Sequence, residues 1–91
     1  MEQGKLIGAI SYALENLREV DRESVREFAL YRQQIEELIA DALKGGDNER
    51  ADNLRQRFLK ASDRNTENYN RRQTVILTMQ DAIRAWRKVQ Q

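Results

Sequence analysis

The sequence contains no cysteine, no histidine and no proline, and only four of its 91 residues are glycine. Without cysteine there is no disulfide framework and no thiolate nucleophile. Without histidine, the usual zinc sites, the di-metal sites of helical bundles and the commonest general base are excluded as well. We therefore expect no metal and no cofactor. The residues that are abundant, Ala, Leu, Glu, Gln and Arg, are strong helix formers, so the composition predicts an all-α protein.

Long apolar runs are also absent. The longest is Val75-Ile76-Leu77, far below the roughly 20 residues that a membrane-spanning helix needs. The first residues show no basic segment followed by an apolar one, which is the pattern of a signal peptide. The formal net charge of +1 gives no overall bias toward nucleic acid or a membrane surface. These features predict a soluble, cytoplasmic protein without a membrane span, with export by a non-classical route left open.

One interruption stands out inside the chain, at Lys44-Gly45-Gly46-Asp47. Two glycines can adopt turn conformations, and an aspartate can cap the helix that follows it. We therefore predict a single helical-hairpin domain over residues 1–91, with a helix at about 3–43, a turn at 44–47 and a helix at about 48–89. Residues 1–46 carry 6 basic and 9 acidic side chains and residues 47–91 carry 10 and 6, so the two halves have opposite net charge and would attract each other.

Both predicted helices carry a heptad pattern, in which apolar side chains recur in alternating steps of three and four and form an apolar seam. The seam of the first helix is predicted to contain Ile7, Ile10, Leu14, Leu17, Asp21, Ser24, Phe28, Tyr31, Ile35, Leu38 and Ala42. The seam of the second is predicted to contain Ala51, Leu54, Phe58, Ala61, Asn65, Asn68, Arg72, Val75, Met79, Ala82, Trp86 and Val89. Such seams are typical of helices that pair along their length.

When the second helix is folded back on the first, the two seams stay in step from the turn to the chain ends. The polar interruptions then meet, with Asp21 opposite Arg72 and Ser24 opposite Asn68. Polar pairs in an apolar seam often fix register and orientation, so we expect these four residues to form a register-setting polar layer. The alternative is a three-helix bundle with a break near residues 20–24, because Asp21 and Ser24 are also plausible helix caps.

Further apolar side chains flank the predicted seams, and two helices alone cannot cover them. Exposed apolar patches usually mark an interface. We therefore predict a homodimer that forms a four-helix bundle, or capture of an amphipathic helix of a partner protein. The predicted interface residues are Leu6, Val20, Ile76, Leu77 and Ile83.

Two other classes of function have some support. A nucleic-acid-binding protein would use basic residues of the second half, but Glu67 and Asp81 interrupt their stripe. These basic residues are Arg64, Arg71, Arg84, Arg87 and Lys88. For a small helical enzyme, Leu17-Arg18-Glu19-Val20-Asp21 resembles the opening helix of all-helical chorismate mutases. The later lysine and arginines of that family have no counterpart at matching spacing, so no catalytic residue is assigned and a non-enzymatic role is favoured.

In size, hairpin outline and lack of cysteine, the chain resembles small secreted helical-hairpin proteins named for a central Trp-x-Gly turn. Its own turn is Lys44-Gly45-Gly46, without tryptophan, so no residue role carries over. The layout is also similar to small helical export chaperones of flagellar and injection-type secretion systems, which hold a partner helix in an apolar groove. The leading expectation is a non-enzymatic interaction module, of the kind used as a small secretion chaperone or adaptor.

Overall fold

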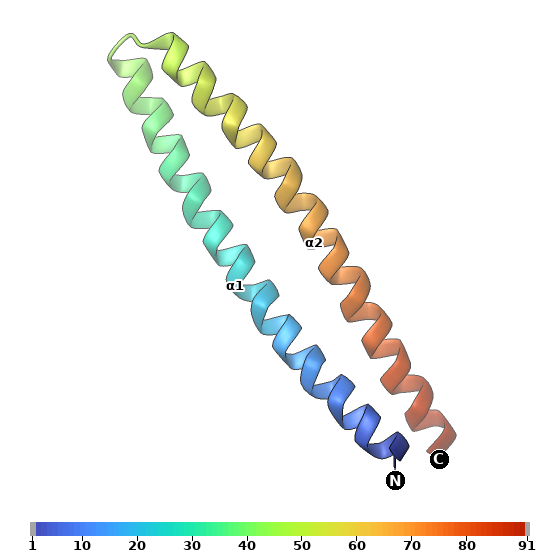
Figure 1. The fold of residues 1–91 in the computed structure, drawn as a ribbon. Coiled ribbons are helices and arrows are strands. Elements are labelled where there is room, and N and C mark those ends of the chain that lie inside the picture. Colours follow the sequence, from blue (N-terminus) through green and yellow to red (C-terminus); the bar gives the residue numbers. More distant parts are fainter. Residues whose placement is uncertain (1, 91) are drawn as a thin grey trace. The chain divides into compact units, whose positions relative to one another are not determined.

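The computed structural model describes residues 2–90, which form two helices joined by a short turn (Figure 1). Helix α1 spans Glu2–Lys44 and helix α2 spans Asn48–Gln90. The expected all-α helical hairpin is confirmed. The predicted domain also included Met1 and Gln91, which lie outside the described residues. Helix α1 runs without interruption through residues 20–24, so the alternative with a third helix is wrong.

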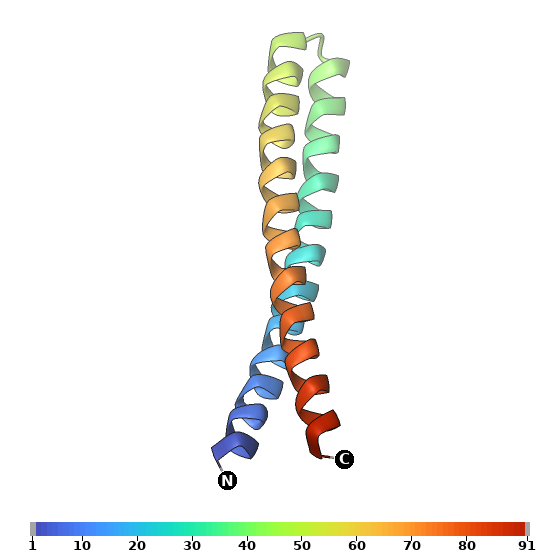
Figure 2. The ribbon, with the colours of Figure 1, turned by 90° about the vertical axis from the view of Figure 1, so that its right-hand side faces the viewer.

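The contacts within the chain divide it into two compact units, and each helix contributes one arm to each unit. Unit 1 contains the described residues up to Glu23 and those from Tyr69 onward. Unit 2 is the segment Ser24–Asn68, which includes the turn. In both units the two arms run antiparallel and lie side by side (Figures 1 and 2).

The turn of unit 2 closes α1 and opens α2 with backbone hydrogen bonds. The Asp47 N–H donates to the Ala42 carbonyl at 2.9 Å, and the Gly46 N–H donates to the Leu43 carbonyl at 3.1 Å. These two bonds make a Schellman motif, which satisfies carbonyls at the end of a helix. The motif places one residue after the helix in the left-handed region of backbone conformation. That residue is Gly46, with φ of 76°. The Asp47 side chain then accepts a hydrogen bond from the Arg50 N–H at 3.1 Å, so the predicted cap of α2 is confirmed.

The core of unit 2 follows the predicted seam closely. Ile35, Ala42 and Ala51 are buried, and three aromatic rings of the seam pack together, with the Phe28 and Phe58 ring centroids 6.0 Å apart. Two positions differ: Leu38 and Asn68 were predicted to lie in the seam, but both are exposed, and Ile39, next to Leu38, is half-buried.

The core of unit 1 differs from the predicted seam on α2. Val75 and Ala82 are exposed, whereas Ile76 and Ile83 are buried beside Leu14. Val89, also predicted in the seam, is exposed too. The row of this arm that faces the core is therefore the buried Ile76 and Ile83 with the half-buried Arg72, Met79 and Trp86. Isoleucine has more apolar area than valine or alanine, so burying the Ile76 row removes more surface from water than burying the Val75 row.

The turn glycine provides a first test. Replacing Gly46 with alanine should lower the free energy of unfolding by about 1 kcal/mol, because an L side chain is strained at positive φ. Gly8→Ala is the matched control: Gly8 lies within α1, nothing stands within 4 Å of an added Cβ, and the change should stabilise by about 0.5–1 kcal/mol. Urea unfolding followed by circular dichroism measures both. Equal and same-signed effects would contradict the turn geometry.

The neighbouring pair Val75 and Ile76 tests which row of α2 is buried. Ile76→Ala should destabilise the chain by about 2–4 kcal/mol, because it removes methyl groups from a packed core. Val75→Ala, one residue away, should cost less than about 1 kcal/mol, because Val75 is exposed. Thermal and urea unfolding of the two variants give the comparison, and a larger loss for Val75→Ala would restore the register predicted from the sequence.

Candidate interaction surface

The strongest polar contact between the helices lies in unit 1, at Asp21. The Arg72 Nε atom donates to Asp21 Oδ1 at 2.8 Å, and the Gln73 Nε2 atom donates to Asp21 Oδ2 at 3.1 Å. The Asp21 and Arg72 side chains are 17% and 16% exposed. The predicted facing of Asp21 and Arg72 is therefore present, and one carboxylate joins α1 to two successive residues of α2.

The second predicted polar pair does not form. Ser24 is half-buried and Asn68 is exposed, and no hydrogen bond joins them within residues 2–90. An exposed amide is hydrated by water and gains little from a serine partner. Only Asp21 and Arg72 of the predicted polar layer are thus in contact, and their role in setting the register stays a prediction.

Two buried polar atoms in the described part of the chain have no hydrogen-bond partner, namely Arg72 Nη2 and Trp86 Nε1. Both belong to unit 1. The Arg72 guanidinium therefore depends on Asp21 for its compensation, because a buried cation without a partner is costly.

One flank of unit 1 is a shallow charged groove of about 410 Å³. Charged side chains from both helices border it, with Glu15 and Arg18 on α1 and Arg84 and Arg87 on α2. The predicted interface residue Leu77 is exposed and, by its position in the helical repeat of α2, lies on this side. On the same side of α1, Glu19 accepts a hydrogen bond from Arg22, and this bond together with the carboxylate charge raises the pKa of Arg22.

The opposite flank of unit 1 carries no charge between residues 6 and 20 of α1 or between residues 75 and 89 of α2, and the next positions of the same rows are Glu23 and Arg71. We call this surface the neutral face. It consists of one row of side chains on each helix, and each row lies next to the core at helical spacing. Its residues are Leu6, Ala9, Ala13, Asn16 and Val20 on α1 and Val75, Thr78, Ala82, Ala85 and Val89 on α2. Because Ser11, Arg18, Gln80 and Arg87 line the groove on one flank, these rows occupy the other flank of each helix.

The large side chains of the neutral face are open to water. Leu6 is 61% exposed, Val20 is 50% exposed and Val89 is 79% exposed. The one hydroxyl on the face is already used, because Thr78 Oγ1 donates to the Thr74 carbonyl at 2.8 Å. The face therefore offers methyl groups and a single amide, that of Asn16.

The predicted interface residues divide between these surfaces. Leu6 and Val20 lie on the neutral face, and Leu77 lies on the groove side. Ile76 and Ile83 were expected beside the seam, but they are 6% and 8% exposed in the core of unit 1, which leaves little of either side chain available to a partner. Val75, Ala82 and Val89 were expected in the seam, but they are exposed and belong to the neutral face.

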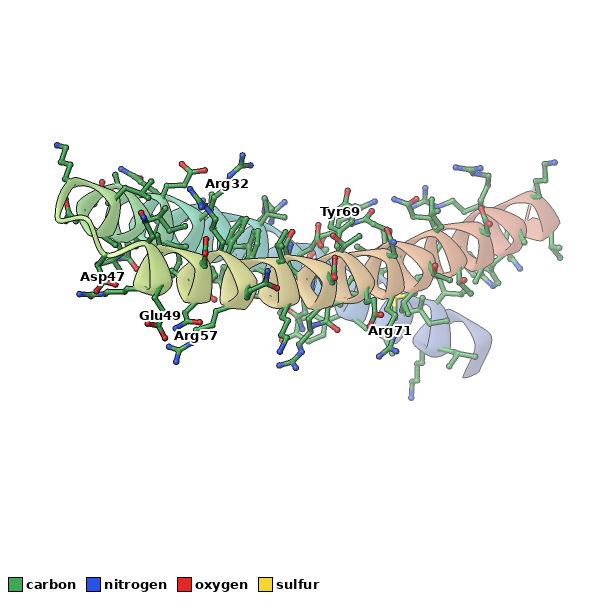
Figure 3. The ribbon with its side chains drawn as sticks, turned by 90° about the horizontal axis from the view of Figure 1, so that it is seen from above. Arg32, Asp47, Glu49, Arg57, Tyr69 and Arg71 are labelled. Carbon is green, nitrogen blue, oxygen red and sulfur yellow. The ribbon has the colours of Figure 1, made fainter. Side chains whose placement is uncertain are left out.

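Basic residues predicted for nucleic-acid binding are spread around α2. Figure 3 shows Tyr69 and Arg71 pointing to opposite sides of the helix. In the same view Arg32, Asp47, Glu49 and Arg57 are labelled on unit 2, where acidic and basic side chains are interspersed.

Over residues 2–90, no group of three or more acidic, histidine or cysteine side chains is placed to hold a metal ion. Neither helix, over the same range, is apolar enough along a sufficient length to cross a membrane.

No protein-family model, curated protein or solved structure matches this chain.

The Asp21 contact generates a test of the polar layer. Asp21→Ala should destabilise the chain by about 1–3 kcal/mol, because Arg72 and Gln73 lose their acceptor while both remain largely buried. Glu36→Ala is the control: it breaks an ion pair with Arg32 in which both side chains are more than 60% exposed, and such pairs contribute about 0.5 kcal/mol or less. Chemical unfolding of the two variants measures the difference. If the Asp21→Ala chain were as stable as the control, the contact of Asp21 with Arg72 and Gln73 would not contribute to the stability of the fold.

Proposed function

We propose that this chain is a non-enzymatic interaction module that binds other helices through the neutral face of unit 1. The observation that carries the proposal is the contrast between the flanks: ten residues without a charge on one side, and a groove bordered by charged side chains on the other. In a sequence in which 34% of residues are charged, the part of a helix surface that faces water is expected to share that charge.

The composition of the face favours helices as its ligands. Alanine and threonine at the middle of the face allow another helix to approach closely, and helix axes pack at about 8–10 Å, depending on the side chains between them. Leucine and valine at the two ends supply apolar area, each side chain contributing about 1.5–3 kcal/mol when fully buried. A partner helix that lays its own apolar stripe on this surface would gain both close packing and burial.

The same features make catalysis a poor explanation of this face. Acid–base and nucleophilic catalysis require polar or titratable groups positioned toward a substrate, and the neutral face offers only one amide. The role of a small chaperone or adaptor, which binds a helix of a client protein, is compatible with this surface and remains one form of the proposal.

Site-specific photocrosslinking tests the proposal in the cell that makes the protein. A photoreactive residue at Ala82 should capture a second polypeptide, because Ala82 lies at the middle of the neutral face. The matched control is the same photoreactive residue at Arg84, which is exposed on the same helix but borders the groove, and it should capture little or nothing. Products are compared by mass on denaturing gels and by peptide sequencing.

Two outcomes would contradict the proposal. The absence of any crosslinked polypeptide at Ala82 would mean that the face is not covered in the cell. Equal capture at Ala82 and Arg84 would mean that contacts are not selective for the neutral face.

A further inference from the structure

We infer that the charged groove of unit 1 binds a small phosphate monoester, which makes it a second binding site on this chain. The groove lies between residues 11–18 of α1 and residues 80–87 of α2, about two helical turns of each arm. It is on the flank opposite the neutral face, so this inference goes beyond the proposed function and does not depend on it.

The groove carries an excess of positive charge. Among the described residues that line it, three arginines and one glutamate give a net charge of +2; they are Arg18, Arg84, Arg87 and Glu15. Asp81 approaches Arg84 to 3.9 Å, but the two side chains are 75% and 74% exposed, and such a pair is weak. Arg18 and Arg87 form no ion pair within residues 2–90. Cations gathered in one groove repel one another, and an anion bound among them offsets this repulsion.

A groove of similar size in unit 2 provides an internal comparison. Its volume is about 420 Å³, and its charged lining residues are Asp47, Glu49, Arg50 and Arg57. Two acidic and two basic side chains leave this groove without net charge. The excess of positive charge therefore distinguishes the groove of unit 1 from the other described hollow of the chain.

The antiparallel course of the two arms directs the arginines toward one another. On α1, Arg18 is the last groove residue along the chain, and on α2, Arg84 and Arg87 are the last two. A helical side chain leans toward the N-terminus of its own helix, so the arginines of the two arms lean toward the middle of the groove from opposite ends. Arg87 also lies in the last turn of α2, where the helix dipole favours a cation. This explanation does not extend to Arg18, which lies well inside α1.

A phosphate monoester matches the groove in charge and in hydrogen-bonding groups. Its phosphate carries about −1.5 to −2 charges at neutral pH and presents three strong acceptor oxygens, and the groove offers a net charge of +2 and three guanidinium groups. Arginine is suited to phosphate because its donors form a planar fork that can bind two oxygens at once. The half-buried side chains of Ser11 and Gln80 add further polar groups.

The size and the lining of the groove favour a small ester. The volume of about 410 Å³ falls within the roughly 300–1,000 Å³ that is typical of small-molecule sites. Leu14 and Ile83, which belong to the core of unit 1, line the groove together with the arginines. The phosphate of a bound ester would lie among the arginines, and its organic group would contact these two apolar side chains.

Calorimetric titration of the purified full chain with phenyl phosphate tests the site. Phenyl phosphate should bind with one-to-one stoichiometry. Benzenesulfonate has the same ring but a single negative charge, so it neutralises less of the charge of the groove. It should bind at least about tenfold more weakly.

A pair of double variants tests which residues bind the ester. Arg18→Ala, Arg87→Ala should weaken the binding of phenyl phosphate at least about tenfold, because it removes two charged donors. The matched control Arg50→Ala, Arg57→Ala removes the same charge from the groove of unit 2 and should change the affinity by less than about twofold. All four positions are exposed and helical, where alanine is the best helix former, so both variants should keep their helix content by circular dichroism.

Glu15 provides a test with the opposite sign. Glu15→Gln removes the acidic side chain from the groove of unit 1 and should tighten the binding of phenyl phosphate, because less negative charge opposes the phosphate. Glu49→Gln makes the same change in the groove of unit 2 and should leave the affinity unchanged.

Several outcomes would overturn the inference. They are no binding of phenyl phosphate, equal binding of benzenesulfonate, an equal loss of affinity in the two double variants, or weaker binding by Glu15→Gln. A short peptide with one phosphoserine is titrated as well. Tighter binding of this peptide than of phenyl phosphate would overturn the assignment to a small ester, because the phosphate would then belong to a modified protein.

Discussion

Two helices side by side can shield only the side chains that point between them, and this constraint governs the whole chain. In each unit the core is a single layer. Among the residues whose exposure is described, no large side chain is fully buried. The apolar residues that flank the core therefore remain in contact with water unless another molecule covers them, and the character of each flank becomes a functional property of the protein.

The thin core also explains why an ion pair is tolerated between the helices. Asp21 and Arg72 retain about a sixth of their exposure, so they keep part of their hydration and the cost of desolvation is smaller than in a thick core. Three polar groups converge there, since Gln73 adds a second donor to the carboxylate. Such an ion pair favours one register of the two helices, because a shift along the helices would separate the charges. The apolar side chains of the interface are less selective, since one can replace another.

Unit 1 has two flanks of opposite character, and the contrast depends on which row of α2 is buried. With Ile76 and Ile83 in the core, Val75, Ala82 and Val89 line up beside Leu6, Ala13 and Val20. Had the Val75 row been buried, the isoleucines would have been the exposed residues and the surface would have been placed elsewhere on α2. The position of the candidate interface therefore depends on how the α2 arm is rotated about its own axis. Neighbouring residues of a helix differ by roughly 100° about that axis.

The sequence by itself determined the helices, the turn at Gly45-Gly46, the Asp47 cap and the facing of Asp21 and Arg72. These features depend on local propensity, on glycine and aspartate chemistry, and on a heptad period that is uninterrupted across most of both helices. Only the tertiary structure decided which of two adjacent apolar rows of α2 packs against α1 in unit 1. Val75, Ile76 and Leu77 are consecutive, so several rows satisfy the periodicity equally well. The choice depends on how much side-chain volume fits against Leu14 and its neighbours across the interface, and a single helix pattern does not contain that information.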